Sequence, residues 1–148
     1  LHLASELIVA GAAREEIVNH LYRTKDMVKL KIWGRVLSRL QQVDTYVVYS
    51  DLSHDDIGGN DVDLQGLVDD LILASPEAHV VLFFYEAKNN ETRVYVYARE
   101  NYDLPLLLQQ YNPEGNRKQV VLTLQKNRVE AENELVAHLR AKLKLIQH

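Results

Sequence analysis

Two strand-like runs joined by a short polar turn constrain the fold of this chain more than any other feature of its sequence. The runs are His79-Val-Val-Leu-Phe-Phe-Tyr85 and Thr92-Arg-Val-Tyr-Val-Tyr-Ala-Arg99. Both are rich in β-branched and aromatic residues, which favour strands. The residues Lys88-Asn-Asn-Glu91 between them are typical of a hairpin turn. The sequence therefore predicts a β-hairpin over residues 79–99.

Segments with helical or strand-like patterns surround the hairpin. Gly34 lies inside one helical segment, where it costs about 1 kcal/mol relative to alanine, and this predicts that another backbone passes close to it. The order of elements predicts an α/β fold with a mixed β-sheet of about four to five strands and flanking helices. A helical segment precedes this fold in the sequence. Besides the hairpin, strands are predicted over 45–51 and 119–124, and helices over 3–10, 14–23, 26–41, 62–74, 103–110 and 130–146.

Length and composition limit the kinds of protein that this chain can be. Its 148 residues, 47% apolar and 26% charged, fit a single globular domain, or one domain and a fragment of another. No apolar run approaches the ~20 residues of a membrane-spanning helix, and no signal peptide is visible. The absence of cysteine excludes disulfides, thiolate metal sites and a cysteine nucleophile, and we expect a cytoplasmic location. Because Leu1 opens the chain in the middle of a helical pattern, we expect a piece of a longer protein.

The net charge of −4 is distributed unevenly along the chain. Segment 45–92 has Lys88 as its single basic residue and is strongly acidic, whereas segments 1–44 and 93–148 are mildly basic. A pI of 5.9 argues against tight, non-specific binding to duplex DNA, which needs many phosphate contacts. It leaves room for a small phosphate pocket in the C-terminal third. We interpret the acidic segment as solvated surface.

The strand over 92–99 has a face with two alternative interpretations. Because strand side chains alternate, Tyr95 and Tyr97 point to the same side as Arg93 and Arg99. Tyrosines can stack on bases and arginines can hold phosphates, so this face could bind a nucleic acid. Alternatively, the tyrosines are half-buried sheet residues under the last helix and the arginines are solvated ends.

Several residues have metal-ligand chemistry without the spacing of a metal site. His54-Asp55-Asp56 are neighbours in a short turn and do not converge readily on one ion, so we interpret them as a turn in which Ser53 bonds its own backbone. Asp61 and Asp63 imitate the start of a calcium loop, but the twelfth position is Ile72 rather than glutamate. The sequence shows no complete catalytic constellation. Three histidines on different predicted elements are interpreted as surface or packing residues: His20, His79 and His138.

The order of these segments resembles that of DHH-family phosphoesterases. The run LASELIVAGAAREEIVNHLYRTKDMVKLKIWGRVLSRL is similar to the helical connector that follows the catalytic module of that family. The strand TYVVYSD, the helix DLQGLVDDLILA and the strands VVLFFYEA and RVYVYARE resemble its DHH-associated C-terminal domain. The resemblance covers residues 1 to about 125 and rests on the order and spacing of elements. It is strongest to the nanoRNases that also remove phosphate from adenosine 3′,5′-bisphosphate, with RecJ-type exonucleases more distant.

The resemblance implies a division of the chain. Residues 1–41 would be a helical connector from a catalytic module, and 42–148 a substrate-binding domain of the DHH-associated kind. In that family the catalytic metals, usually manganese, are held by Asp and His ligands of the preceding module. No cofactor is therefore expected in this chain itself. The associated domain supplies substrate-binding groups across the cleft between the two modules.

Two motifs of that family are present in altered form. A Ser-x-Arg-Ser pattern corresponds to Tyr97-Ala-Arg-Glu100, which keeps the arginine, Arg99, and replaces both serines. A glycine-rich loop closed by histidine corresponds to Tyr111–Lys118, which keeps Gly115 and has Asn116 in the histidine's place. The resemblance implies that Arg99 holds phosphate. Weaker substrate-binding candidates are Arg117, Lys118, Asn116, Tyr97 and Gly115.

The alterations change the chemistry of this loop. Pro113 removes a backbone donor and Glu114 adds a negative charge, and both oppose phosphate binding. Glu100 could pair with the neighbouring arginine and compete with a phosphate. Arg117 and Lys118 could restore positive charge. Either this loop binds a different ligand than in the family, or it has lost its binding pocket.

The leading hypothesis is a substrate-recognition domain of a DHH-like phosphoesterase that binds a phosphorylated nucleotide or short single-stranded oligonucleotide. The alternative is a degenerate, non-binding module used for interdomain or subunit contact and regulation, and an unrelated small enzyme is a third hypothesis. Expected partners are the preceding catalytic module of the same chain and the nucleotide or short nucleic acid, but no membrane. A homodimer is kept open. The alternative is motivated by an apolar stripe on the last helix that could dock elsewhere or pack on its own sheet: Leu135, Leu139, Leu143 and Ile146.

Overall fold

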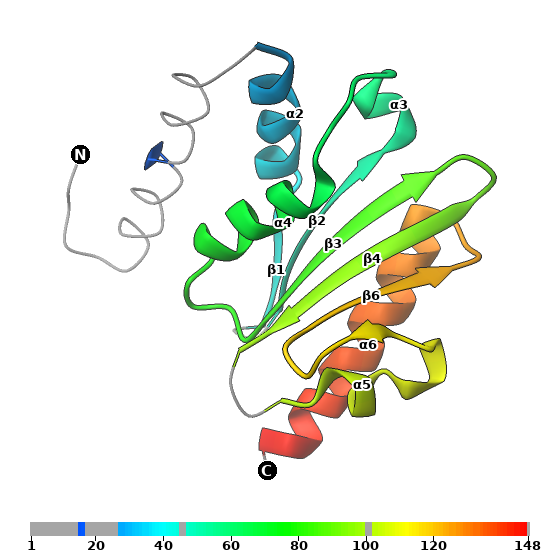
Figure 1. The fold of residues 1–148 in the computed structure, drawn as a ribbon. Coiled ribbons are helices and arrows are strands. Elements are labelled where there is room, and N and C mark those ends of the chain that lie inside the picture. Colours follow the sequence, from blue (N-terminus) through cyan, green and yellow to red (C-terminus); the bar gives the residue numbers. More distant parts are fainter. Residues whose placement is uncertain (1–14, 17–26, 45–46, 100–101, 148) are drawn as a thin grey trace.

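The computed structural model of the chain describes residues 15–16, 27–44, 47–99 and 102–147, with side chains described up to residue 143 (Figure 1). The helices predicted over 3–10 and 14–23 lie outside these residues, except for residues 15 and 16, which are helical. The division of the chain at residue 41 stays a prediction.

The described residues form a six-stranded mixed sheet, which confirms the predicted α/β fold. Its order is β1 (Gln41–Val43), β2 (Val47–Ser53), β3 (Val80–Ala87), β4 (Glu91–Ala98), β6 (Gln119–Leu124) and β5 (Glu114–Gly115). Strands β2 and β3 are parallel and all other neighbours are antiparallel. The sheet has more strands than predicted because β1 and β5, at its two edges, are too short to show an alternating pattern.

Helices cover both faces of the sheet (Figure 1). Helices α2 (Met27–Ser38) and α4 (Leu64–Leu73) lie on one face, and α5 (Leu104–Leu107) and α6 (Arg128–Gln147) on the other. The short helix α3 (His54–Ile57) follows β2, and a 3₁₀ turn, η1 (Gln109–Tyr111), follows α5. Two apolar cores result, one on each face of the sheet.

The β3–β4 hairpin confirms the strongest sequence prediction. Ala87 pairs with Glu91, and Asn89 and Asn90 in the turn have positive φ angles of 71° and 54°. Asparagine tolerates this left-handed conformation better than most residues. The alternation of strand side chains is also as predicted, because Val94, Val96 and Ala98 lie in one core while Tyr95 lies in the other.

One interpretation of the sequence expected the last helix to cover the tyrosine face, and this expectation is wrong. Helix α6 packs against the face that carries Val94 and Val96, whereas Tyr95 and Tyr97 face the side of α2 and α4. Tyr95 is buried and Tyr97 is half-buried. The expectation failed because residue alternation assigns side chains to two faces but does not say which helix covers which face.

The apolar stripe of α6 packs on the sheet of its own domain. Leu135, Leu139 and Leu143 are each 0% exposed and belong to the core beneath α6. The side chain of Ile146 lies outside the described ones. The stripe therefore gives no support to a docking role for this helix.

Gly34 does not have the close backbone neighbour that the sequence predicted. A Cβ atom at this position would meet no atom within 4 Å. Helix α2 buries Ile32, Trp33 and Val36 against the sheet, whereas Gly34 is on the exposed side of the helix. Within the described part of the chain, no helix has the length and apolar character that crossing a bilayer requires.

Candidate functional site

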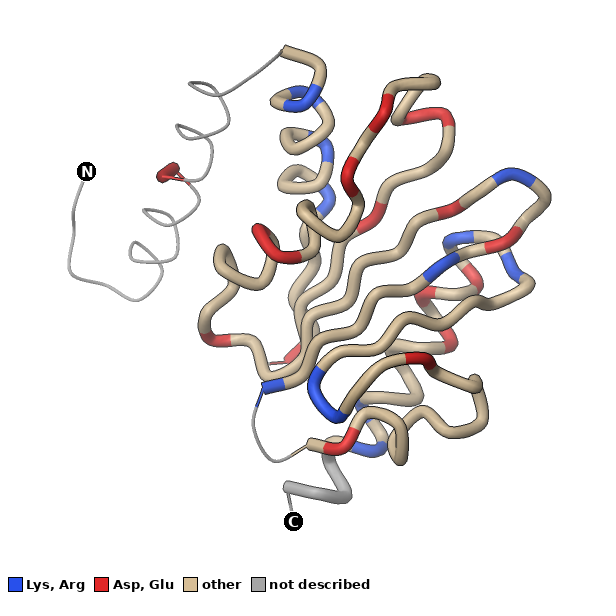
Figure 2. The backbone as a smooth tube through the Cα atoms, viewed as in Figure 1, with Lys and Arg blue, Asp and Glu red and all other residues tan. Residues whose placement is uncertain are grey.

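The backbone positions of the predicted site residues lie close together at one end of the sheet, where β4 ends and β6 begins. We call Arg99, Arg117 and Lys118 the basic corner. The backbone N–H of Ala98 donates to the carbonyl of Lys118 at 2.8 Å, and that of Leu104 donates to the carbonyl of Arg117 at 3.0 Å. These bonds place Arg99, the next residue after β4, beside the other two basic residues. Figure 2 shows this gathering of basic residues at the end of β4 and the start of β6.

A tight turn presents two of the three basic residues. Gly115 has a φ of 146°, and a Cβ atom there would lie 2.1 Å from the carbonyl oxygen of Gln119. Asn116 closes the turn, because its Oδ1 accepts from the backbone N–H groups of Lys118 at 2.9 Å and Gln119 at 3.0 Å. The side chain of Arg117 is 72% exposed, with its Nε 3.9 Å from a carboxylate oxygen of Asp103, and Lys118 is also exposed. Gly115 and Asn116 therefore shape the turn that carries the two cations.

The guanidinium of Arg99 makes several contacts within the domain. Its Nε donates to the carbonyl of Ala78 at 2.6 Å, and its Nη2 donates to the carbonyl of Ser75 at 2.8 Å. Its central carbon lies 5.6 Å from the centre of the Tyr97 ring, within the range of a cation–π contact. The predicted pairing with Glu100 lies outside the described residues. Two of the five N–H donors of Arg99 are thus used by backbone carbonyls.

His79, which the sequence analysis interpreted as a surface or packing residue, also lies at this corner, and its closeness to Arg99 was not predicted. Its carbonyl accepts from the backbone N–H of Arg99 at 2.9 Å, and its Nδ1 is 2.9 Å from the hydroxyl of Tyr102. The signal that could have found it is the hairpin register. Because Val80 pairs with Ala98, the next residues outward are His79 and Arg99.

A second cluster of charged residues lies toward the other end of the sheet and was not predicted. Arg39 donates to both carboxylate oxygens of Asp56, at 2.5 and 2.9 Å. This bidentate pair holds the pKa of Asp56 well below its usual range. Arg39 and Arg128 also contact the same oxygen of Asp51, at 3.4 and 3.2 Å. The cluster thereby joins the end of α2, the strand β2 and the start of α6.

Glu132 on α6 belongs to this cluster. Burial raises its pKa to about 9, and the neighbouring carboxylate of Asp51 adds to the effect through a hydrogen bond and charge repulsion. The carboxyl of Glu86 on β3 accepts from the backbone N–H of Arg128 at 2.7 Å, which satisfies one of the first N–H groups of α6. Because these contacts connect elements of one domain to each other, we interpret the cluster as structural.

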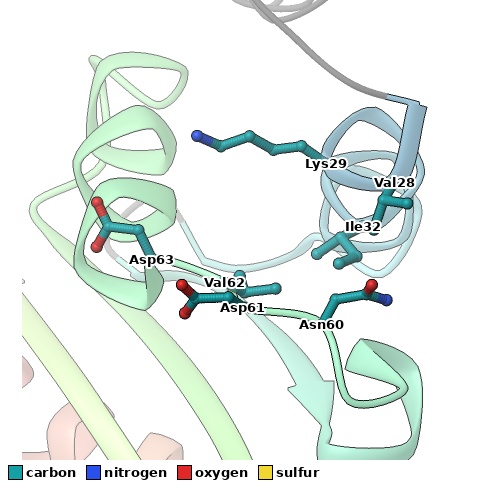
Figure 3. Close-up of a pocket in the computed structure, with 7 residues that line it drawn as sticks. All are labelled: Val28, Lys29, Ile32, Asn60, Asp61, Val62 and Asp63. Carbon is teal, nitrogen blue, oxygen red and sulfur yellow. The ribbon is translucent and has the colours of Figure 1, made fainter.

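Two hollows lie away from the basic corner. One, of about 390 Å³, is formed by the start of α2 and the segment before α4. Figure 3 shows Lys29 pointing from α2 toward α4 across it. The hollow is lined by Val28, Lys29, Ile32, Asn60, Asp61, Val62 and Asp63. The other, of about 370 Å³, lies at the ends of β2 and β3 and is lined by Ser53, His54, Asp55, Glu86, Ala87, Lys88 and Asn89.

Two of the residues with metal-ligand chemistry, Asp56 and Asp63, take part in helix caps. The hydroxyl of Ser53 accepts from the backbone N–H of Asp56 at the start of α3, in the turn that the sequence predicted. Asp63 accepts from the backbone N–H of Gly66 at the start of α4. Among the residues that the structure describes, no group of three or more His, Asp and Glu could hold a metal ion.

The comparisons with known proteins concern the fold. No protein-family model and no curated protein matches the sequence. An exopolyphosphatase-related protein from Bacteroides fragilis has a similar structure, with a TM-score of 0.71 and 17% identity, covering 91% of this chain and 41% of that chain. A pGpG-specific phosphodiesterase from Vibrio cholerae is also similar, with a TM-score of 0.54 and 9% identity, covering 79% and 40%. The chain spans less than half the length of either protein. It has a fold that occurs in phosphoesterase-related proteins.

Proposed function

We propose that this chain is the substrate-recognition domain of a DHH-like phosphoesterase and that it binds a phosphorylated nucleotide or short single-stranded oligonucleotide at the basic corner. The observation that carries the proposal is the turn at one end of the sheet that exposes Arg117 and Lys118 and whose backbone is hydrogen-bonded to Ala98, the residue before Arg99. Guanidinium and ammonium groups bind phosphate oxygens through charge-assisted hydrogen bonds. The similarity in fold to two phosphoesterase-related proteins supports the same function.

In the whole protein, the proposal assigns the chemical step to a preceding catalytic module. That module would hold manganese and generate the attacking hydroxide, while this domain would hold the phosphorylated substrate against it. Tyr97 would offer a ring for base stacking beside the basic corner. We also propose that the whole protein is an enzyme of the nanoRNase group. Adenosine 3′,5′-bisphosphate and short RNA therefore serve as probe ligands.

Calorimetric titration of the 148-residue chain tests the proposal. The probes are adenosine 3′,5′-bisphosphate and a 5′-phosphorylated adenosine trinucleotide. Combined Arg117→Gln and Lys118→Gln substitution should weaken binding by about tenfold or more, because two charge-assisted contacts are lost. Lys88→Gln is the matched control, since this exposed lysine lies in the hairpin turn at the other end of β4, and it should leave affinity unchanged. Failure of the unaltered chain to bind either probe would contradict the proposal.

Two observations favour the alternative, a module that serves interdomain or subunit contact. Asn116 uses its side-chain oxygen to close its own turn, and Arg99 donates to two backbone carbonyls. A decayed pocket would keep such structural bonds while losing its ligand. In the same titration, negligible binding by both the unaltered chain and the double variant would support this alternative.

A further inference from the structure

We propose that Arg99 is a positioning residue that fixes the connection between α4 and β3, and that Lys118 and Arg117 make the phosphate contacts. This inference rests on the proposed function, and it gives the residues of the basic corner other roles than they would have in the DHH family. There, the arginine after the strand is the group expected to hold phosphate.

The contacts of Arg99 converge on one short segment, residues 75–79. Its backbone N–H donates to the carbonyl of His79, and its side chain donates to the carbonyls of Ala78 and Ser75. Ser75 and Ala78 are only 7% and 4% exposed. A buried carbonyl that loses its donor costs free energy because water does not replace the bond. Arg99 therefore supplies a donor to the buried carbonyl of Ala78 and a second donor to the carbonyl of Ser75, which also accepts from the backbone N–H of Ala78.

The shape of the guanidinium suits this structural role. Nε and Nη2 belong to one rigid, planar fork, which reaches two carbonyls at once. Tyr97 lies close to the same guanidinium, 5.6 Å from ring centre to carbon. The group is thus held by the α4–β3 connection and by the strand that carries it. A lysine has a single nitrogen on a flexible chain and cannot reproduce this fork.

Lys118 and Arg117 have the opposite character. Both are exposed, and their turn is fixed by Gly115 and by the side-chain oxygen of Asn116. The carbonyl of Lys118 accepts from the N–H of Ala98, the residue before Arg99. Through this bond the end of β4, which Arg99 ties to residues 75–79, also supports the turn. Arg99 acts through the backbone, and the two exposed cations face the solvent from which a ligand arrives.

The salt dependence of binding separates a phosphate contact from a positioning role. Each phosphate contact to a single-stranded ligand contributes about 0.7 to the slope of log K against log salt concentration. With the 5′-phosphorylated adenosine trinucleotide as probe, Lys118→Gln should reduce the slope by about this amount and weaken binding by roughly tenfold. Arg99→Gln and Arg99→Lys should leave the slope unchanged, as should the control Lys88→Gln.

Hydrogen exchange of the free chain measures the positioning role independently of any ligand. The reporter is the amide of Ala78, which donates to the carbonyl of Ser75 at 3.2 Å. Both Arg99→Gln and Arg99→Lys should accelerate its exchange by about tenfold, because each loses the fork that holds the segment. The amide of Asn60, which donates to the carbonyl of Ile57 at 3.2 Å after α3, is the internal control and should change little.

Two results would overturn the inference. The first is a salt slope that is reduced in Arg99→Gln and restored in Arg99→Lys, because a positive charge at position 99 would then be enough for the phosphate contact. The second is unchanged exchange at Ala78 in both Arg99 variants. If the unaltered chain binds no probe, the proposed function fails together with the roles of Lys118 and Arg117. The exchange measurement then still decides the role of Arg99.

Discussion

Gly115 is the residue on which the turn of the basic corner depends most directly. Its φ of 146° is a conformation that essentially only glycine adopts, and a Cβ atom would lie 2.1 Å from backbone. We expect Gly115→Ala to destabilise the domain by about 1–3 kcal/mol and to weaken nucleotide binding, because Lys118 and Arg117 leave their positions. Urea denaturation and the calorimetric titration described above measure the two effects.

Gly34→Ala is the matched control for this substitution. Gly34 lies on the exposed side of α2, where a Cβ atom meets nothing within 4 Å. Alanine there should stabilise the domain by about 0.5–1 kcal/mol, because it removes backbone freedom from the unfolded chain. A Gly115→Ala variant as stable as the unaltered chain would show that the turn is not the rigid support inferred for the basic corner.

The attachment of α6 to the sheet should depend on pH through Glu132. Its pKa is raised from 4.5 to about 9 in the folded domain. A carboxyl with a raised pKa contributes most to stability below about pH 4.5, and this contribution decreases as the pH rises toward 9. Glu132→Gln removes the ionisation and keeps a donor for Asp51. We therefore expect the variant to be more stable than the unaltered chain, by on the order of 2 kcal/mol at pH 8.

Denaturation midpoints in urea at pH 5, 7 and 9 measure this difference. The advantage of Glu132→Gln over the unaltered chain should grow with pH across this range. Glu130→Gln, at an exposed position in the first turn of the same helix, controls for the loss of one negative charge. A constant or shrinking difference would contradict the raised pKa of Glu132.

Individual elements were predictable where their patterns are local. The hairpin over β3 and β4 follows from alternating residues and a turn of four, and the turn closed by Ser53 follows from its side chain. Asp63, which lies inside the helix predicted over 62–74, instead caps the start of α4. The edge strands β1 and β5 were not predictable, because three and two residues carry no periodicity. They form only because β2 and β6 offer unpaired backbone groups at their edges.

At the scale of the whole molecule, the missing information is long-range contact. Asp51 and Arg128 are 77 positions apart and meet at 3.2 Å, and Arg99 and Ser75 are 24 positions apart. No local pattern encodes such pairs. The sequence therefore indicated the cations of the basic corner but not the carbonyls to which the Arg99 side chain donates. It also assigned the tyrosine face correctly to one side of the sheet, yet could not tell which helices lie there.

The contacts at the two ends of the sheet also lead us to expect that the isolated chain does not hydrolyse RNA. In the charged cluster, Arg39 and Arg128 pair with Asp51 and Asp56, and the basic corner repels cations. Manganese-dependent hydrolysis needs carboxylate or imidazole ligands that converge on a metal to generate hydroxide. We expect the purified 148-residue chain to bind the trinucleotide without cleaving it in the presence of manganese. Chromatographic analysis of the RNA after incubation measures this. Cleavage that the Arg117→Gln and Lys118→Gln substitutions abolish would place catalysis in this domain and contradict its assignment to recognition.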